Sequence, residues 1–235
     1  QKITNVNKAL TDILLQVGEN ERTAGRHVKY NVYVKAVNAL KSHPTKITSG
    51  AEAQKLDGIG KKIGLKIDEI LKTGQLEKLE KAKADPVQQS LNRFNRIHGI
   101  GPVTARKWID QGIMTLAQLR TEIAAGKITL TKEQTIGLEH LEDFEKRIPR
   151  GEMDKHVELI QNALRPLDSK LQIQIVGSYR RGAESCGDID VLLAHANFDA
   201  KAHANKQFGT YIKDVVAALS AHHYIKHQLS QGNLK

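Results

Sequence analysis

The stretch GSYRRGAESCGDIDVLL, residues 177–193, constrains the fold and chemistry of this chain more than any other. Residues 171–176 before it alternate polar and apolar side chains and then run into glycine, a pattern typical of a half-buried strand that ends in a turn. Residues 188–193 predict a second strand. The sequence therefore predicts two strands joined by a segment rich in glycine and arginine.

Two aspartates stand at the start of the second predicted strand. Because successive strand side chains point to opposite faces, Asp188 and Asp190 share one face. Ile189 and Val191 are expected to pack on the other face. Two carboxylates so close repel each other unless a cation lies between them, and hard oxygen ligands suit Mg²⁺ or Mn²⁺. The pair alone could be solvated strand-end aspartates, and the neighbouring turn favours a metal site.

That turn has the residues of a phosphate-binding loop. Gly177 and Ser178 offer backbone N–H groups that a phosphate can approach, and Gly187 lets a ligand lie against the backbone. Arg180 and Arg181 add charge that can neutralise a phosphate, although an arginine pair alone is usually a surface patch. Strand, turn and aspartates together predict a site for a metal and a phosphate.

Two glycine hairpins occur earlier in the chain, LDGIG at 56–60 and IHGIG at 97–101. The first precedes a helix predicted over 61–72, and the second a helix with Pro102 near its first position. Such a hairpin brings backbone N–H groups and a helix N-terminus against a DNA phosphate without reading any base. The hairpin glycines expected to contact DNA are Gly58, Gly60, Gly99 and Gly101.

The rest of the chain before residue 171 is predicted to be helical. Capping boxes begin at Ser49, Thr115 and Thr131, and the proline in Lys83–Pro86 marks the expected hinge. The first strand is expected only at about Leu171. Predicted helices with apolar stripes cover 4–16, 30–40, 61–72 and 204–221, and 88–165 is expected to be almost wholly helical.

Composition indicates a polyanionic partner. The chain has 36 Lys+Arg and 26 Asp+Glu, a net charge of +10, and residues 1–83 alone hold 16 basic and 9 acidic residues. The single cysteine, Cys186, is interpreted as a small filler and fits a reducing compartment. No apolar run approaches the length of a membrane span. His222, His223 and His227 lack further ligands at zinc spacing and are interpreted as surface residues.

The stretch 177–193 resembles the signature of the nucleotidyltransferase superfamily, and in this wording it is similar to the X family of DNA polymerases. SGAEAQKLDGIGKKI, GIGPVTARKW and DFEKRIPRGEM extend the resemblance over essentially all 235 residues. It implies an α+β, mostly helical fold with a helix-hairpin-helix motif in each of its first two parts. Those parts are an all-α deoxyribose-phosphate lyase domain over 1–83 and a helical DNA-binding subdomain over 84–145, followed by a partial palm with a small sheet over 146–235.

Residues 61–72 also suggest a second chemistry. Lys62 and Lys66 are four apart on one helix face, and partial burial with nearby lysines (Lys29, Lys35 and Lys61 are candidates) favours the neutral, nucleophilic amine. They could instead be simple phosphate contacts, and composition does not decide. The resemblance implies that Lys66 forms a Schiff base with a 5′-deoxyribose phosphate, while Lys29, Tyr33 and Lys62 hold the 5′-phosphate and order the pocket; Lys35 is a further DNA contact.

The resemblance also implies the remaining ligands. Asp188 and Asp190 bind two magnesium (or manganese) ions, and Gly177, Ser178, Arg181 and Gly187 line a deoxynucleoside triphosphate. Backbone carbonyls hold a monovalent cation, Na⁺ or K⁺, at each hairpin; they belong to Gln54, Leu56 and Ile59 and to Asn95, Ile97 and Ile100.

Three positions depart from the family pattern. Leu65 stands where the family often has a glutamate beside the Schiff-base lysine, Val28 where it often has a histidine, and Gln54 where it often has a lysine. The first change removes a plausible proton shuttle and the third a phosphate contact. Lyase chemistry is therefore expected to be present but slower.

The expected protein is a monomeric base-excision-repair DNA polymerase. Its implied partners are gapped or nicked DNA with a 5′-phosphate, deoxynucleoside triphosphates and other repair proteins, with no membrane; the implied location is nuclear, with mitochondria as an alternative. The family has a third aspartate on a later strand, and only Asp199 and Asp214 follow Asp190 here, so a piece of a longer polymerase or a natural truncation is expected. A noncatalytic DNA-binding module and a nucleotidyltransferase acting on RNA or a small molecule are the rival hypotheses.

Overall fold

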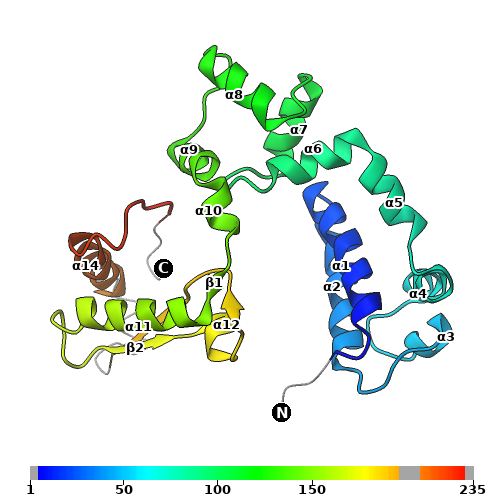
Figure 1. The fold of residues 1–235 in the computed structure, drawn as a ribbon, viewed down its shortest axis with the longest axis horizontal. Coiled ribbons are helices and arrows are strands. Elements are labelled where there is room, and N and C mark those ends of the chain that lie inside the picture. Colours follow the sequence, from blue (N-terminus) through cyan, green and yellow to red (C-terminus); the bar gives the residue numbers. More distant parts are fainter. Residues whose placement is uncertain (1–4, 196–206, 231–235) are drawn as a thin grey trace. The chain divides into compact units, whose positions relative to one another are not determined.

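The structure, a computed structural model, describes residues 5–195 and 207–230. It divides into two compact units, residues 1–130 and 131–235 (Figure 1). No helix in the described ranges is long and apolar enough to cross a membrane. The helices of the first unit are α1 (Lys8–Thr23), α2 (His27–Ser42), α3 (Gly50–Ala53), α4 (Lys61–Thr73), α5 (Glu77–Ala84), α6 (Pro86–Phe94), α7 (Pro102–Asp110) and α8 (Leu116–Ala124).

The first unit is built around α1 and α2, which pack along their length (Figure 1). Leu14, Leu40 and Ile67, from α1, α2 and α4, have no exposed surface and form the centre of a single apolar cluster. Removing about 25 cal/mol per Å² of apolar surface from water stabilises such a cluster. The predicted stripes of these helices are confirmed, except that α1 begins at Lys8 and Val6 before it is 41% exposed.

The capping prediction holds at two of the three positions. Thr115 and Thr131 form full capping boxes, each with the glutamine three residues later. Ser49 accepts from the Glu52 backbone N–H at 3.1 Å, but the Glu52 carboxylate accepts from Thr48 N–H at 2.8 Å, one residue before the predicted partner. The orphan N–H groups of α3 are satisfied in a slightly different way.

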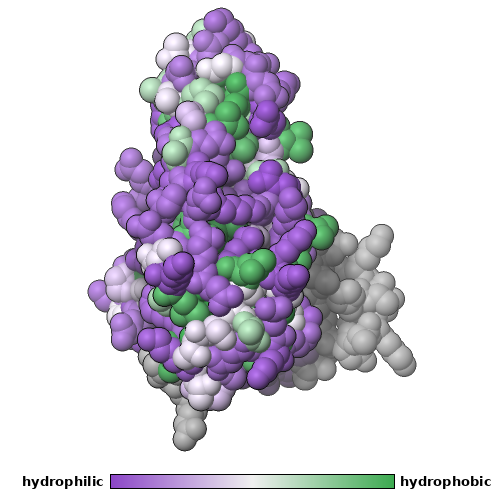
Figure 2. Space-filling view, turned by 90° about the vertical axis from the view of Figure 1, so that its right-hand side faces the viewer, coloured by the Kyte–Doolittle hydropathy of each residue, from purple (hydrophilic) through white to green (hydrophobic). Residues whose placement is uncertain are grey.

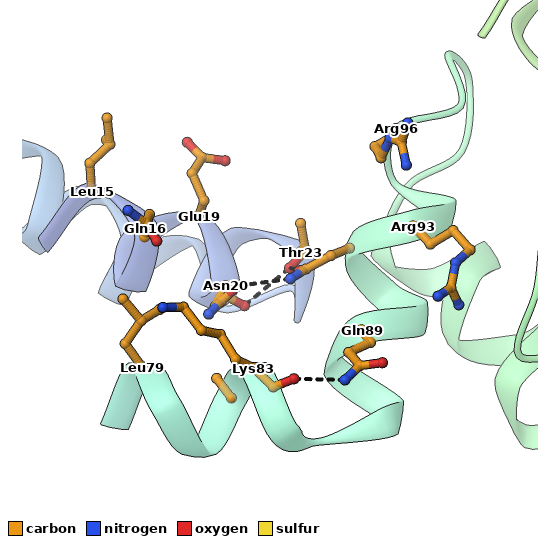
Figure 3. A pocket seen from close by; sticks show the side chains of 12 residues that line it. Leu15, Gln16, Glu19, Asn20, Thr23, Leu79, Lys83, Gln89, Arg93 and Arg96 are labelled. Atoms are coloured by element: carbon orange, nitrogen blue, oxygen red, sulfur yellow. Dashed lines mark hydrogen bonds between the residues drawn. The ribbon is translucent and has the colours of Figure 1, made fainter. Parts of the chain in front are cut away.

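Helices α5 and α6 are separated by a single residue, Asp85, which ends one helix and caps the other. The proline break is thus where the sequence predicts it. Asn20, Thr23 and Asn92 join α6 to α1 through amide and hydroxyl hydrogen bonds, including Thr23 Oγ1 to Asn92 Oδ1 at 2.6 Å. Figure 3 shows Asn20 and Thr23 at a cleft between α1, α5 and α6, where Gln89 also donates to the Lys83 carbonyl at 2.7 Å. The cleft has a volume of about 660 Å³.

The second unit contains the strands. Its elements are α9 (Lys132–Glu139), α10 (Leu141–Glu145), β1 (Ile148–Pro149), α11 (Arg150–Leu164), β2 (Gln172–Ile175), α12 (Gly177–Arg180), β3 (Ser185–Cys186), β4 (Val191–Ala194) and α14 (Gln207–Ala221). Strand β1 pairs antiparallel with β3, and β2 with β4, in two separate two-stranded sheets. Helices α11 and α14 pack together, and Met153, Ile160 and Leu164 of α11 form a buried cluster with Val215 and Leu219 of α14.

Three strand predictions are corrected. The first strand lies at Ile148 rather than near Leu171, because β1 is a two-residue strand that carries no alternation to read. Strand β4 begins at Val191, so Asp188 and Asp190 precede it. Val191 is 37% exposed, whereas Ile189 packs against the core as expected. Cys186 is fully buried in β3, as a filler would be.

Candidate functional site

The predicted phosphate-binding turn and the second aspartate are in direct contact. Gly177 begins α12 with a φ of 58°, in the left-handed region that favours glycine. A Cβ added there would lie 1.8 Å from Asp190 Oδ2, so no side chain fits without moving that carboxylate. The Val176 N–H also donates to the Asp190 carbonyl at 2.9 Å. The structure therefore brings together two site residues that lie thirteen positions apart.

Both aspartates are available as ligands. Asp188 and Asp190 are exposed, and within 5–195 and 207–230 neither carboxylate makes a hydrogen bond or ion pair. Free carboxylate oxygens beside a glycine turn fit Mg²⁺ or Mn²⁺. Among the described residues no group of three His, Cys, Asp or Glu side chains could hold a metal. Asp214 is exposed on α14, Asp199 lies outside the described residues, and His222, His223 and His227 are exposed, as predicted.

Two arginines missed by the sequence analysis hold the loop that carries this turn. Arg150 Nη1 donates to the Tyr179 and Ala183 carbonyls at 3.1 and 3.2 Å, and its guanidinium stacks 4.4 Å from the Tyr179 ring centre. Arg147 Nε donates to Ser185 Oγ at 2.7 Å. Both lie within the stretch DFEKRIPRGEM, directly before and directly after β1. The pairing of β1 with β3, which brings them to this loop, is not visible in the sequence.

The other predicted phosphate ligands surround this turn. Ser178 is half-buried in α12, and Arg180, Arg181 and Gly187 are exposed. In the described part of the chain the Arg180 and Arg181 guanidinium groups form no hydrogen bond or ion pair. These cations therefore remain available for an anion, in contrast to Arg150.

The two hairpins have the same backbone geometry. Gly58 and Gly99 have φ of 89° and 81°, and the residue after each donates from its N–H to the carbonyl two residues before the glycine, at 3.2 and 3.1 Å. Gly60 and Gly101 then cap α4 and α7, with Pro102 in the first turn of α7. The predicted repeat is confirmed as a repeat of structure.

The capping glycines face open space. A Cβ at Gly60 or Gly101 would meet no atom within 4 Å, so internal packing does not require glycine there. A bare backbone at a helix N-terminus allows a phosphate to approach the unsatisfied N–H groups. The Leu56 and Ile97 carbonyls each accept one turn hydrogen bond and keep a second lone pair, which fits the predicted monovalent-cation sites.

The residues of the predicted lyase pocket lie on α2 and α4. Lys66 is half-buried and its Nζ donates to the Lys62 carbonyl at 3.3 Å, whereas Lys62, Lys29 and Lys35 are exposed and Tyr33 is buried. Lys35 forms an ion pair with Asp57 at 3.0 Å beside the first hairpin. The face seen in Figure 2, which includes α4 and α5, is mainly hydrophilic, with apolar side chains in small separate groups. Such a face does not favour a large apolar partner.

Burial lowers the pKa of the Lys66 amine below its ordinary value, and the positive charge of Lys78 lowers it further. The sequence predicted the direction of this shift from burial and neighbouring lysines. It named Lys29, Lys35 and Lys61 as candidates and missed Lys78, which reaches the pocket from α5. A lower pKa increases the fraction of neutral amine at pH 7, which is the nucleophilic form.

The three residues that depart from the family pattern are exposed. Leu65 and Val28 are 60% and 80% exposed, so neither is a core residue. Gln54 turns back to the Gly50 carbonyl at 3.2 Å and lies against the Gly64 backbone. Its side chain therefore closes the contact between α3 and α4 instead of extending towards a ligand.

Four family models match the chain. They are "Helix-hairpin-helix domain" over residues 5–76, "SAM-like Helix-hairpin-helix tandem" over 51–111, "Fingers domain of DNA polymerase lambda" over 92–145 and "DNA polymerase beta palm" over 147–235. Their order agrees with the hairpins, the helical segment and the strand-turn-aspartate site. The chain belongs to the X family of DNA polymerases.

The similar proteins are named as DNA polymerases. The chain is 35% identical over 204 residues to DNA polymerase lambda of Rattus norvegicus, covering 86% of this chain and 34% of the relative. It is 33% identical to DNA polymerase lambda of Arabidopsis thaliana, with 86% and 37% covered. It is 30% identical to the DNA polymerase type-X family protein pol4 of Schizosaccharomyces pombe, with 84% and 38% covered. The chain thus spans little more than a third of the length of these relatives.

Proposed function

We propose that this chain carries the lyase and DNA-binding parts, and part of the palm, of a gap-filling base-excision-repair DNA polymerase. The observation that carries the proposal is Lys66, a half-buried amine of lowered pKa on the helix that follows a phosphate-binding hairpin. The relatives are named as DNA polymerases, which supports the polymerase part. We further propose a nuclear location and a monomer, with other repair proteins as partners.

Within the family we propose the beta-like type. The wording GSYRRGAESCGDIDVLL is similar to that of DNA polymerase beta, and the palm match carries the beta name. The fingers match and the rat and plant relatives carry the lambda name instead. The lyase reaction depends on Lys66 and nucleotidyl transfer depends on Asp188 and Asp190, whichever of the two types the chain is.

The lyase reaction begins at the Lys66 nitrogen. The neutral amine attacks the C1′ aldehyde of the ring-opened sugar, and loss of water gives a protonated imine. A C2′ proton then passes to water, the C3′–O bond breaks, and the DNA strand leaves with its 5′-phosphate. Water hydrolyses the imine and restores the amine. Lys62, one helical turn before Lys66 on α4, and Lys29 on α2 are both exposed and would bind the sugar's 5′-phosphate.

The palm site would serve nucleotidyl transfer. A divalent ion would supply charge neutralisation between the primer and the triphosphate. Asp188 and Asp190 would hold it, while Arg181 and the Gly177, Ser178 and Gly187 backbone would orient the phosphates. The contact between Gly177 and Asp190 fixes the carboxylate next to the phosphate turn.

Reductive trapping tests the proposal. Borohydride should link this chain covalently to DNA that bears a 5′-deoxyribose phosphate, because reduction fixes the imine at Lys66. DNA with the same sequence and an intact 5′-nucleotide is the matched control and should give no adduct. A chain that binds the gapped DNA but gives no adduct would support the noncatalytic module instead.

Binding to gapped DNA with a 5′-phosphate should weaken steeply with salt. The hairpins contact phosphates, and each neutralised phosphate releases counterions, giving a slope of about −0.9 per contact in log K against log salt. Permuting the sequence beside the gap should change the affinity little. Fluorescence anisotropy across a salt series measures the salt slope and the affinity for each permuted sequence. RNA of equal length serves as the competitor. A strong sequence preference, or equal binding to RNA, would contradict the assignment.

Primer extension by the 235-residue chain should be negligible. Positioning and charge stabilisation supply nearly all of the catalysis in this type of transfer. Asp188 and Asp190 provide two carboxylates, and among the described residues no group of three potential metal ligands is found. A gel assay with a single-nucleotide gap measures extension beside the trapping reaction. Robust extension would mean that Asp199, Asp214 or a partner supplies the third ligand.

A further inference from the structure

Glu21 is a buried carboxylate that the lyase chemistry described above does not use. It lies on α1, and its side chain is only 2% exposed. Its two oxygens have different partners: Oε1 accepts from Lys78 Nζ of α5, and Oε2 accepts from Arg26 Nε, just before α2. Glu21 follows the apolar stripe Leu10, Leu14 and Val17 by one further helical step, a position where a carboxylate is costly to bury.

The two hydrogen bonds keep this carboxylate ionised. Burial alone would raise the pKa of the Glu21 carboxyl, but hydrogen bonds from Lys78 and Arg26 bring its pKa below the ordinary value. Burial would likewise lower the pKa of Lys78, but the hydrogen bond to Glu21 raises it above its usual value. At neutral pH the pair is therefore a fixed anion and a fixed cation. Glu21 is poorly suited to be a base, because both oxygens are occupied.

The position of Lys78 is what matters for the lyase pocket. Its Nζ lies 5.7 Å from the ring centre of Tyr33, a predicted pocket residue of α2 that is 5% exposed. Lys78 is also the strongest charged influence on Lys66, ahead of Glu69 and Lys62 on α4 and of Glu21 on α1. The charged groups around the reactive amine thus come from three helices, and the one from α5 is held in place by Glu21.

We propose that Glu21 is a positioning residue of the lyase site, which fixes the Lys78 ammonium beside Tyr33 and Lys66 so that its charge acts on the reactive amine. This inference rests on the proposed lyase function. Lys78 is 46% exposed, and without its partner the flexible stem would let the ammonium move into water, where its effect on Lys66 is screened. Leu65, the residue before Lys66, carries no charge.

Replacing Lys78 tests the charge. Lys78→Met keeps an apolar stem and removes the ammonium, so the pKa of Lys66 should rise. Because the neutral fraction falls tenfold per unit below the pKa, a rise of about half a unit to one unit slows the reaction roughly three- to tenfold at pH 7. The single-turnover rate of strand release should recover towards about pH 9. Lys78→Arg should retain the parent profile, and Lys81→Met, on the same helix but paired with Glu77, is the control.

Replacing Glu21 tests the positioning, because two explanations predict opposite signs. The negative charge of Glu21 itself raises the pKa of Lys66, but less strongly than Lys78 lowers it. If Glu21 acts only through its charge, Glu21→Gln moves the rate profile to lower pH. If it positions Lys78, Glu21→Gln releases the ammonium and moves the profile to higher pH, and Glu21→Gln with Lys78→Met is no slower than Lys78→Met alone. A profile that moves down, or a lower rate without a pH shift, overturns the proposal.

Two controls distinguish a failure of the positioning role of Glu21 from a failure of the lyase assignment. Lys66→Ala, trapped in parallel, should lose the adduct; if it does not, the lyase assignment fails whatever Glu21 does. If Lys66→Ala loses the adduct while Lys78→Met and Glu21→Gln leave the pH profile unmoved, only the positioning role fails. Thermal unfolding of each variant checks folding, and the partly exposed Lys78→Met tests the proposal even where Glu21→Gln is unstable.

Discussion

Lys66→Ala should reduce the borohydride-trapped adduct by at least about tenfold, because the Schiff base needs an amine at that position. Lys66 is the half-buried lysine of the pocket, and burial together with the Lys78 charge lowers its pKa. The imine forms only at an amine that the C1′ aldehyde can reach, so a lysine elsewhere on the surface replaces Lys66 poorly. The measurement is the yield of covalent protein–DNA complex on a denaturing gel, under single-turnover conditions.

Two other variants of α4 make that result specific. Lys62→Ala removes an exposed charge one helical turn away and should weaken DNA binding while retaining trapping at saturating protein. Lys72→Ala removes an exposed charge from the last turn of α4 and should change neither DNA binding nor trapping. Equal trapping by Lys66→Ala and the parent would show that the nucleophile is another amine. Loss of trapping in all three variants would point to charge rather than to one nucleophile.

Local patterns account for the parts of the fold that were predicted correctly. The hairpin glycines, the capping threonines and the break at Pro86 are set by backbone chemistry within a few residues, and the structure has them where the sequence places them. The apolar stripe of α4 was readable for the same reason. Such features need no knowledge of what packs opposite.

Features that depend on distant partners were missed. Strand β1 has only two residues, and it exists because Ile148 and Pro149 pair with β3, nearly forty positions later. Val191 was expected to pack because it is apolar, yet its burial depends on a neighbour that alternation cannot reveal. The contact between Lys78 and Glu21 depends on the packing of α5 against α1, which the sequence does not show. Glu21 within an apolar stripe was the one available hint.

Gly177→Ala should weaken binding of Mn²⁺ with a deoxynucleoside triphosphate about as much as Asp190→Ala does, by at least roughly tenfold if the carboxylate is a ligand. The added Cβ would lie 1.8 Å from Asp190 Oδ2 and 2.9 Å from its Cγ, so the carboxylate must turn away from the phosphate turn. The φ of 58° adds a backbone cost of about 1–2 kcal/mol for any residue with a Cβ. Titration of Mn²⁺ with a fluorescent nucleotide measures binding.

Gly182→Ala is the control that separates the steric effect on Asp190 from the free-energy cost of a positive φ. Gly182 follows the same helix α12 with a φ of 78°, but a Cβ there meets nothing within 4 Å. It should therefore lower the unfolding free energy by about the same backbone term and leave nucleotide binding intact. Because Gly177→Ala and Asp190→Ala remove the same ligand, the double variant should bind no worse than either single variant. Additive losses, or normal binding by Gly177→Ala, would show that Asp190 does not act from the position next to the turn.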